Sequence, residues 1–516
     1  MRALISVWDK AGLDGFVKGL SALGWELVAS GGTAAYIEEI GLNVTQVESL
    51  TEFPEMLGGR VKTLHPKIHA GILARREVES DLAALDAHAI EPFDLVCVNL
   101  YPFEQVAREH GVREEEAVEM IDVGGPSMLR GAAKNFAHVA PVCRPADYER
   151  VLDELRSAGT LSLETRRGLA ATAFATSSSY ESAIASWFAG RESFPPIFTP
   201  VFEKQLDLAY GENPHQRAAY YAETGARTHL MSMVSKLHGK ELSFNNVLDL
   251  DAARRLVAEF AEPACAIVKH NNPCGVAIAG EIEDAYERAL ACDPLSAFGG
   301  VIAMNREVSL PLAERLHQNF VEVLVAPGYG GGALEVLQQK EAIRILEDTE
   351  RRAMTPTERD VKRVRGGLLV QDADHVTETR EDMEVATQTA PTEEQWTDLL
   401  FAWKVCRHVR SNAIVLAKDG ATIGIGAGQM SRVDSVRIAI DKARDARGDE
   451  AAAALAGSVC ASDAFFPFPD GPQTAMDAGV RAIAQPGGSK RDGEVIAACE
   501  RSGAAMVFTG RRHFRH

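Results

Sequence analysis

The chain lacks the sequence features that mark membrane and secreted proteins. It contains no apolar run of about 18 residues, the length that a membrane helix needs, and its first apolar run ends at Asp9 and Lys10. A secretory signal requires a longer apolar stretch behind basic residues. The eight cysteines form no Cys-x-x-Cys pair and no Cys/His cluster of zinc spacing. We therefore expect a cytoplasmic protein with reduced, mostly buried thiols and no transition metal.

Basic residues are scarce relative to acidic ones. The chain has 54 Lys and Arg against 73 Asp and Glu, for a formal net charge of −19. This balance argues against nucleic acid or an anionic membrane as a partner, and an anionic substrate would need a local basic pocket. With 516 residues, 46% hydrophobic and 25% charged, the chain has the composition of a globular protein of about two to four domains.

Short apolar runs alternate with helical patterns in the first 190 residues, which predicts βαβ units around a parallel sheet. Strands are expected at Leu4–Trp8, Glu26–Ala29, Asp94–Asn99 and His138–Cys143. Helices are expected at Leu13–Leu23, Thr33–Ile40, Glu114–Ile121, Pro126–Lys134 and 163–189, with Pro126 suited to a first helical position. Clustered prolines at 191–200 then interrupt this pattern. We therefore predict domains at 1–195 and 196–516.

The second half again predicts an α/β arrangement. Strands are expected at Ala264–Lys269, Gly300–Met304, Val321–Ala326, Gly367–Val370, Ala413–Lys418, Thr422–Ala427 and Ala504–Thr509. Segments 293–300 and 462–468 each pair an acidic residue with an Ala-Phe step. Two related subdomains would explain this echo, and so would chance.

Two clusters of basic and amide residues lie far apart in the sequence. Arg60, Lys62, Thr63 and His65 lie within one Gly/Pro-flanked segment, a plausible clamp for an oxyanion or a phosphate. Residues 269–273, Lys-His-Asn-Asn-Pro, follow an apolar strand. Each cluster has the composition of an active site on a loop, so the chain is expected to run two reactions.

Further candidates surround the first cluster. Residues 30–33, Ser-Gly-Gly-Thr, follow a strand and open a helix, where backbone N–H groups can bind an anion. A turn that simply requires glycine explains them equally well, and neither the Walker pattern nor Gly-x-Gly-x-x-Gly is present. Tyr101, Asp122 and Lys134 lie at strand or helix ends, where single residues of these types are more often a core phenol, a cap and a solvated cation.

Eight motifs occur together and in order, namely GGRVKTLHPKIHAGILAR, LVCVNLYPF, IDVGGPSMLRGAAKN, YGENPHQ, KHNNPCG, DPLSAFGG, IGIGAGQMSR and SDAFFPF. By them the whole chain resembles the bifunctional purine-biosynthesis enzymes that combine IMP cyclohydrolase with AICAR transformylase. The resemblance implies an N-terminal methylglyoxal-synthase-like parallel sheet domain. It also implies a C-terminal transformylase built from cytidine-deaminase-like α/β subdomains. Implied partners are purine nucleotide intermediates, 10-formyltetrahydrofolate as co-substrate and a second copy in a homodimer. The resemblance leaves room for a monovalent cation.

In the first domain the resemblance assigns the nucleotide phosphate to Ser30, Gly31, Gly32 and Thr33, with Lys10, Arg60 and Thr63 nearby. The reacting formyl and carboxamide groups would lie among Lys62, Tyr101, Asp122 and Lys134. Both reacting groups belong to one molecule, so positioning supplies much of the rate. Lysines can stabilise a developing alkoxide, while Asp122 and Tyr101 orient or shuttle protons.

In the second domain the resemblance implies that Lys269 and His270 are the catalytic pair, with Asn412 positioning the formyl group. An imidazole that titrates near neutrality suits removal of a proton from the weakly nucleophilic 5-amino group. The implied nucleotide contacts are Tyr210, His215, Phe298, Gly299, Glu322, Arg432 and Arg512, and the implied folate region contains Asp463 and Phe465.

Two departures and two alternatives accompany this interpretation. Ala209 stands where the family has an arginine, and Arg512, Lys236 or Lys240 are candidates to replace that cation; the C-terminal residues 512–516 also differ modestly from the family ending. A zinc hydrolase fits poorly, because Cys274 is followed by alanine at 277 instead of a second cysteine. A ligand-sensing binding protein is the other alternative, but it would not need proton-transfer groups in both halves.

Overall fold

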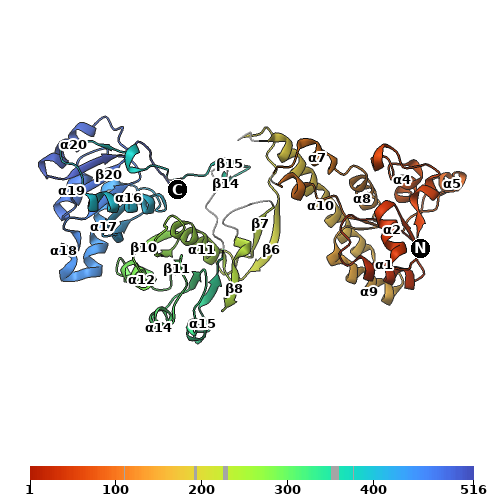
Figure 1. Ribbon diagram of the computed structural model, residues 1–516, viewed down its shortest axis with the longest axis horizontal. Coiled ribbons are helices and arrows are strands. Elements are labelled where there is room, and N and C mark those ends of the chain that lie inside the picture. The colour runs from red at the N-terminus through yellow and green to blue at the C-terminus, as the bar shows by residue number, and fades with distance from the viewer. Residues whose placement is uncertain (110, 191–193, 225–230, 350–358, 376) are drawn as a thin grey trace. The chain divides into compact units, whose positions relative to one another are not determined.

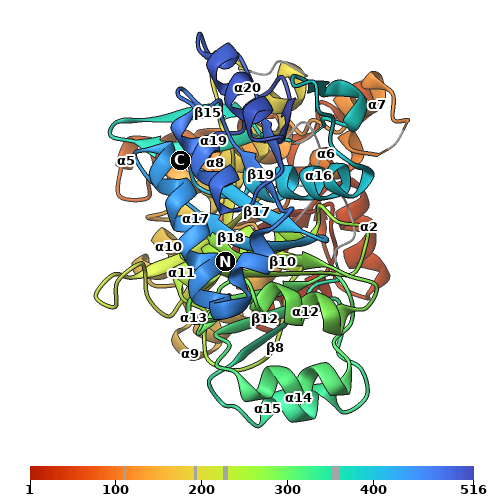
Figure 2. The same ribbon diagram turned by 90° about the vertical axis from the view of Figure 1, so that its left-hand side faces the viewer.

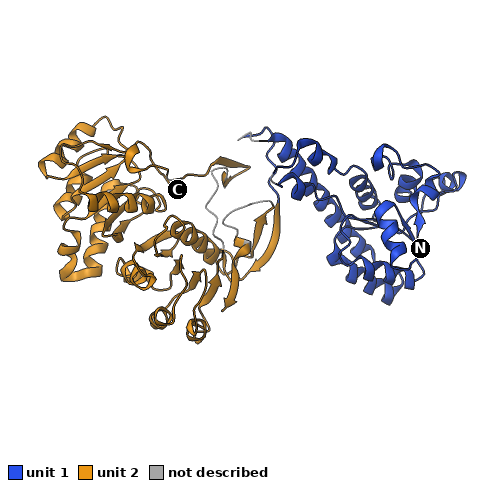
Figure 3. Cartoon of the chain, in the orientation of Figure 1, with its two compact units in different colours: residues 1–201 blue, residues 202–516 orange. Residues whose placement is uncertain are grey.

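The computed structural model describes residues 1–516 except 110, 191–193, 225–230, 350–358 and 376 (Figure 1). The chain divides into two compact units, Met1–Val201 and Phe202–His516 (Figure 3). The predicted proline-rich boundary lies next to this division, although its first three residues fall outside the described part. Among the described helices, none is long and apolar enough to cross a membrane.

Unit 1 is built around a parallel sheet of five strands in the order β3-β2-β1-β4-β5. Its central strand is fully buried at Ala3, Leu4 and Ile5, as expected when helices cover both faces. The strands are β1 Arg2–Ser6, β2 Glu26–Ala29, β3 Thr45–Gln46, β4 Leu95–Val98 and β5 Ala140–Val142. The helices are α1 Leu13–Ala22, α2 Gly31–Glu39, α3 Val47–Thr51, α4 Pro66–Leu73, α5 Glu79–Ala87, α6 Phe103–Ala107, α7 Glu114–Glu119, α8 Gly124–Lys134, α9 Tyr148–Ala158 and α10 Leu163–Ala189.

The predicted strands and helices of unit 1 are confirmed, although most of their ends shift by one or two residues. Strand β2 has the predicted limits, and α2 begins at Gly31 instead of Thr33. The prediction that Pro126 opens a helix was wrong, because α8 already begins at Gly124. Strand β3 was not predicted, since two polar residues at a sheet edge carry no recognisable alternation.

Unit 2 contains one mixed sheet of twelve strands in the order β16-β21-β20-β19-β17-β18-β10-β9-β11-β12-β13-β8. The strands are β8 Ser235–His238, β9 Ala264–Lys269, β10 Asn272–Ile278, β11 Val301–Met304, β12 Val323–Ala326, β13 Arg344–Glu347, β16 Glu384–Val385, β17 Ile414–Lys418, β18 Ala421–Gly426, β19 Val459–Ser462, β20 Ala482–Gln485 and β21 Ala505–Phe508. Two separate hairpins pair β6 Phe202–Leu208 with β7 Ala218–Glu223, and β14 Arg359–Val364 with β15 Gly367–Asp372.

The helices of unit 2 lie on both faces of this sheet. Helices α11 Phe244–Val257 and α16 Glu393–Arg407 contribute to one apolar core. Two further cores contain residues of α12 Ile282–Leu290, α14 Leu310–Gln318 and α15 Ala333–Gln338, and of α17 Arg432–Arg447, α19 Asp470–Ala478 and α20 Asp492–Arg501. The short helices α13 Pro294–Ala297 and α18 Ala451–Leu455 complete the unit.

The order of elements in unit 2 repeats once. The first half runs β8, α11, β9, β10, α12, β11, α14, β12, α15, β13, and the second runs β16, α16, β17, β18, α17, β19, α19, β20, α20, β21. Each half has an antiparallel hairpin, three parallel strands and a short antiparallel edge strand. The similarity between segments 293–300 and 462–468 does not follow this repeat. Strands β11 and β19 are equivalent in the two halves, but segment 293–300 precedes β11 whereas segment 462–468 begins at the end of β19.

The two halves join where β10 and β18 lie side by side (Figure 2). The hydroxyl of Thr422 on β18 is fully buried there. It accepts the N–H of Val276 at 2.9 Å and donates to the carbonyl oxygen of the same residue at 3.1 Å. One side chain therefore satisfies two backbone groups at the seam.

Candidate active sites

The segment Ser30–Thr33 in unit 1 forms the start of α2 directly after β2. The N–H groups of Gly31 and Gly32 belong to the first turn, where a helix has no internal acceptors for them. Gly31 has φ 48°, and a Cβ there would overlap the Lys62 ammonium. The Thr33 hydroxyl, by contrast, bonds to both the N–H and the carbonyl of Val7, at 3.1 and 3.0 Å. Backbone N–H groups and Lys62, more than the Thr33 side chain, are thus available to an anion.

Lys62, Tyr101 and Asp122 lie close enough to influence one another electrostatically. Burial raises the pKa of Tyr101, the Asp122 charge raises it further, and Lys62 opposes both. Burial also raises the pKa of Asp122, partly offset by backbone N–H groups that include Gly125 at 2.7 Å. Thr63 is nearby, because its Oγ1 lies 2.7 Å from the position that a Cβ on Gly124 would take.

Three other predicted residues of unit 1 have different surroundings. The Lys10 ammonium donates to the carbonyls of Val7 and Trp8, and burial lowers its pKa. Arg60 pairs with Glu119 on the surface. Lys134 is exposed at the C-terminal end of α8, about 15 Å along the axis from Gly124 at about 1.5 Å per residue. The structure does not bring Lys134 into the cluster around Asp122.

Three residues beside this site were not predicted. Glu55 lies 2.6 Å from the Lys62 ammonium, and Glu48 lies 3.8 Å from it. Tyr180 on α10 accepts the N–H of Asp122 at 2.7 Å and donates to the carbonyl of Met120 at 2.8 Å. Nothing in the sequence links Tyr180 to a turn so far from it, whereas Glu55 at least lies near Lys62 along the chain.

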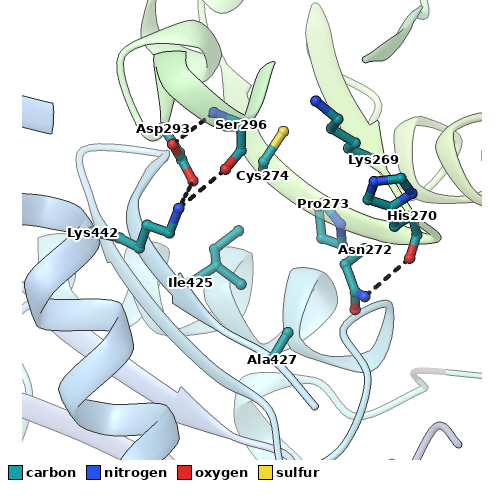
Figure 4. Close-up of a pocket in the computed structure, with 10 residues that line it drawn as sticks. All are labelled: Lys269, His270, Asn272, Pro273, Cys274, Asp293, Ser296, Ile425, Ala427 and Lys442. Atoms are coloured by element: carbon teal, nitrogen blue, oxygen red, sulfur yellow. Dashed lines mark hydrogen bonds and ion pairs between the residues drawn. The ribbon is translucent and has the colours of Figure 1, made fainter. Parts of the chain in front are cut away.

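In unit 2 a pocket of about 180 Å³ holds the predicted catalytic pair (Figure 4). Lys269 and His270 lie on one side of it, and Asp293, Ser296 and Lys442 on the other. Lys442 approaches Asp293 at 2.7 Å and Ser296 at 3.1 Å. Burial would raise the pKa of Asp293, but Lys442 and Ser296 outweigh it and leave the pKa below its usual value. The side of the pocket opposite His270 is thus formed by Asp293, Ser296 and Lys442, which hold one another in place and were not predicted from the sequence.

The predicted turn at Phe298 and Gly299 lies beside Lys269. The Lys269 ammonium donates to the Phe298 carbonyl at 2.6 Å. Glu322 is close to this turn, since its N–H bonds to the carbonyl of Gly300 at 3.1 Å. Its carboxylate, however, pairs with the buried Arg344 at 2.6 Å. A ligand would have to compete with Arg344 for Glu322.

Asn412, Arg432 and Asp463 form a second group. Arg432 donates to the side-chain oxygen of Asn412 at 2.7 Å and pairs with Asp463. Asp463 is fully buried and also accepts the hydroxyl hydrogen of Ser411. The carboxylate of Asp463, placed by the resemblance in the folate region, is therefore covered and holds Arg432 in place. Phe465, two residues later, is 40% exposed.

The two groups of unit 2 meet at their loops. The N–H of Arg410 donates to the Asn272 side chain at 2.9 Å, and Arg515 donates to the Asn271 side chain at 2.7 Å. Arg515 of the C-terminal segment therefore contacts the turn that follows Lys269, while the buried His513 lies against Asp374 and Glu378.

The remaining predicted contacts lie outside these groups. The carbonyl of Tyr210 accepts the N–H of Phe244, His215 is exposed, and Arg512 stacks over the Phe514 ring at 4.7 Å. Of the cations proposed to replace the missing arginine at 209, Lys236 is paired with Glu241 at 2.7 Å.

The cysteines agree with the expectation of mostly buried, unpaired thiols. All eight are free and seven are buried, while Cys274 is half-buried in the pocket wall. Over the part of the chain that the structure describes, no group of three His, Cys, Asp or Glu residues could hold a metal ion.

The fold and the sites define an α/β protein whose two units each present a lysine-centred polar site. Residues 132–442 match the AICARFT/IMPCHase bienzyme model, and residues 12–127 match the MGS-like domain. The chain is 48% identical over 520 residues to the bifunctional purine biosynthesis protein PurH of Anoxybacillus flavithermus, covering 100% of this chain and 99% of that protein. It is also 48% identical over 518 residues to PurH of Bacillus cereus, with the same coverage. A solved chain described as the crystal structure of ForH is 41% identical, with a TM-score of 0.34, and covers 37% of this chain and 97% of its own length.

The chain belongs to the AICARFT/IMPCHase bienzyme family. It is a bifunctional enzyme of purine biosynthesis with formyltransferase and IMP cyclohydrolase activities, and its formyl transfer depends on folate. The expected α/β fold, with an MGS-like parallel sheet in the N-terminal part, is confirmed.

Proposed function

We propose that unit 1 carries the IMP cyclohydrolase and unit 2 the AICAR formyltransferase, in line with domains 1–195 and 196–516. The observation that supports this division is that each unit holds its own lysine-centred site, Lys62 in one and Lys269 in the other. The MGS-like match lies wholly within unit 1, which agrees with the assignment.

In cyclisation the carboxamide nitrogen of the formylated nucleotide attacks its own formyl carbon, and water then leaves. Gly31 and Gly32 bind the phosphate through backbone N–H groups. Lys62 stabilises the oxygen that becomes negative during attack. Asp122 accepts the proton from the attacking nitrogen. Tyr101 remains protonated because its pKa is raised by burial, so it can give a proton to the departing hydroxide.

Lys134 is also proposed to take part in cyclisation. Its exposed side chain has to reach back from the far end of α8 to meet the reacting groups.

In formyl transfer the 5-amino group of AICAR attacks the formyl carbon of 10-formyltetrahydrofolate. His270 takes the proton from that amine, and tetrahydrofolate leaves with the electron pair of the broken C–N bond and a proton. Lys269 stabilises the formyl oxygen once the ammonium turns from the Phe298 carbonyl. Asn412 orients the formyl group, and Arg432 fixes the Asn412 amide at 2.7 Å.

The proposal includes a cytoplasmic homodimer and a monovalent cation in unit 2. Tyr210, His215, Phe298, Gly299, Glu322 and Arg512 are proposed as nucleotide contacts, with Phe465 near folate; Lys10, Arg60 and Thr63 are proposed contacts in unit 1.

The test supplies AICAR with 10-formyltetrahydrofolate and identifies the nucleotide products by chromatography. Wild-type protein should form IMP. The His270→Ala variant should fail to formylate AICAR but still cyclise supplied formyl-AICAR without folate. Formation of IMP from AICAR by His270→Ala at the wild-type rate would remove His270 as the base.

A further inference from the structure

The proposed base, His270, stands on a two-residue turn between β9 and β10. Both residues of this turn, His270 and Asn271, have left-handed backbone angles, with φ 53° and 62°. Two-residue hairpins of this shape favour Asn-Gly or Asp-Gly, because both central residues need positive φ. Positive φ is uncommon for residues other than glycine, although histidine and asparagine adopt it more often than most, so contacts from neighbouring groups help to hold this turn.

The repeat supplies a second copy of the turn without the histidine. Strands β17 and β18 are joined by Asp419 and Gly420, with φ 54° and 72°. Both turns directly follow a lysine, Lys269 in one and Lys418 in the other. The second turn has the Asp-Gly sequence that this conformation prefers.

One aspartate caps each turn from the preceding helix. Asp249 of α11 accepts the N–H of His270 at 3.1 Å through one oxygen and the N–H of Asn271 at 2.6 Å through the other. Asp398 of α16 accepts the N–H of Asp419 at 2.8 Å and of Gly420 at 2.7 Å in the same way. Each aspartate follows the first residue of its helix by five positions, from Phe244 to Asp249 and from Glu393 to Asp398.

The histidine turn is also held from its other side. Arg515 donates to the Asn271 side chain at 2.7 Å and to the His408 carbonyl at 2.5 Å. Its backbone is anchored to Ser411, whose N–H bonds to the Arg515 carbonyl at 2.9 Å. Asp249 therefore fixes the backbone of the turn, while Arg515 fixes its outer side chain.

We propose that Asp249 is a positioning residue for formyl transfer: its carboxylate, assisted by Arg515, holds the His270–Asn271 turn so that the imidazole faces the pocket. The inference rests on the proposed role of His270 as the base. Asp398 does the same for a turn that bears no histidine.

The test compares Asp249→Asn with its internal counterpart, Asp398→Asn. An amide offers one acceptor where the turn presents two N–H donors, so either variant loosens its own turn. Formyl transfer by Asp249→Asn should lose about 10- to 100-fold in kcat, since a misplacement of about 1 Å costs on the order of 100-fold. KM for AICAR and cyclisation of supplied formyl-AICAR should stay within about twofold. The matched Asp398→Asn should keep the wild-type kcat.

A double variant tests whether Asp249 acts through the histidine. Adding Asp249→Asn to His270→Ala should cause no further loss of transfer. Arg515→Ala, which leaves Asp249 intact, should also lower kcat for formyl transfer. This variant keeps the proposal testable if Asp249→Asn does not fold. As a control, Arg511→Ala removes a neighbouring cation that pairs with Glu378 instead of the turn and should leave transfer unchanged.

Three results would overturn the positioning role. They are wild-type kcat in both Asp249→Asn and Arg515→Ala, an equal kcat loss in Asp398→Asn, or a further loss when Asp249→Asn is added to His270→Ala. The His270→Ala variant alone separates the two levels of failure. If it is inactive while the Asp249 variant is normal, only the positioning role fails; if it is active, the proposed base fails and the inference with it.

Discussion

The ammonium of Lys62 lies 2.6 Å from the carboxylate of Glu55, closer than the 3.8 Å that separates it from Glu48. The same ammonium is packed so tightly against Gly31 that a methyl group on that residue would overlap it. An anionic nucleotide that binds at Gly31 must therefore share Lys62 with Glu55.

Glu55→Gln should strengthen nucleotide binding in unit 1. The amide keeps the size of the side chain but removes the negative charge that competes for Lys62. We expect KM for formyl-AICAR to fall about two- to fivefold, the change that loss of about 0.5 to 1 kcal/mol of competing ion pairing produces. Steady-state cyclisation rates measure it. Glu52→Gln is the matched control, because Glu52 pairs with Lys67 at 3.0 Å instead of Lys62. A raised KM in Glu55→Gln would show that the carboxylate helps to hold the site.

Lys62→Ala should abolish cyclisation and spare formyl transfer. Loss of a preorganised donor to a developing oxyanion costs about 100-fold or more in kcat, and the two sites lie in separate compact units. Each half-reaction is assayed with its own substrate. Lys67→Ala removes a neighbouring ammonium and should cyclise normally. Equal loss of both activities in folded Lys62→Ala protein would contradict independent sites.

The pH dependence of cyclisation should reflect Asp122. Burial raises the pKa of this carboxyl above its ordinary value of 3.8. If the ionised form accepts the proton, the rate falls as pH drops through the raised pKa, so the acid limb lies at higher pH than for an ordinary aspartate. Asp122→Asn should lower kcat/KM on the order of 100-fold and remove that limb. Profiles of kcat/KM for both proteins check this, and an unchanged acid limb in Asp122→Asn would assign it to another group.

Unit 2 should lose stability as pH falls because of a buried histidine. Burial, together with the Arg407 charge, lowers the pKa of His408 from 6.5 to about 3. Between these values the unfolded chain binds a proton that the folded chain does not, so the free energy of unfolding decreases toward acid, by up to about 1.4 kcal/mol per pH unit. Glu259 adds to the loss at lower pH: burial alone would raise its pKa, but His408 and Arg407 outweigh this and lower it from 4.5 to about 2.

Urea unfolding followed by tryptophan fluorescence from neutral pH to pH 4 measures this effect, since the buried Trp403 lies one helical turn before Arg407 on α16. In the His408→Asn variant the free energy of unfolding should decrease less steeply with falling pH, above the pH range in which Glu259 titrates. The same slope in both proteins would assign the acid sensitivity to other groups.

The sequence predicts elements well where a strand is a buried apolar run. Strand β9 has its predicted limits because five of its six residues are buried and none of them before Lys269 is charged. Strand β10 was missed, since Asn272, Pro273 and Gly275 have the composition of a loop although they pair with β9.

Site residues were likewise predicted where they are close together in the sequence and missed where only folding brings them together. Lys62, Lys269 and His270 were predicted because several functional residue types fall within a few positions of each other. Asp249 was not, because it meets His270 only when α11 folds against β9 and β10. The burial of Asp463 was likewise out of reach, since it depends on Arg432 and Ser411 from other elements.

The seam at Thr422 bears on how the larger unit unfolds. One apolar core contains Leu250 and Trp403 from the two halves together, and the rings of Phe260 and Phe401 lie 5.4 Å apart across them. With a shared core and a shared sheet, neither half has a complete interior of its own. The β17–β18 hairpin, whose turn has no histidine, pairs with the β9–β10 hairpin through β18 and β10. A substitution that disrupts the β17–β18 hairpin should therefore lower the melting temperature of unit 2 as a whole.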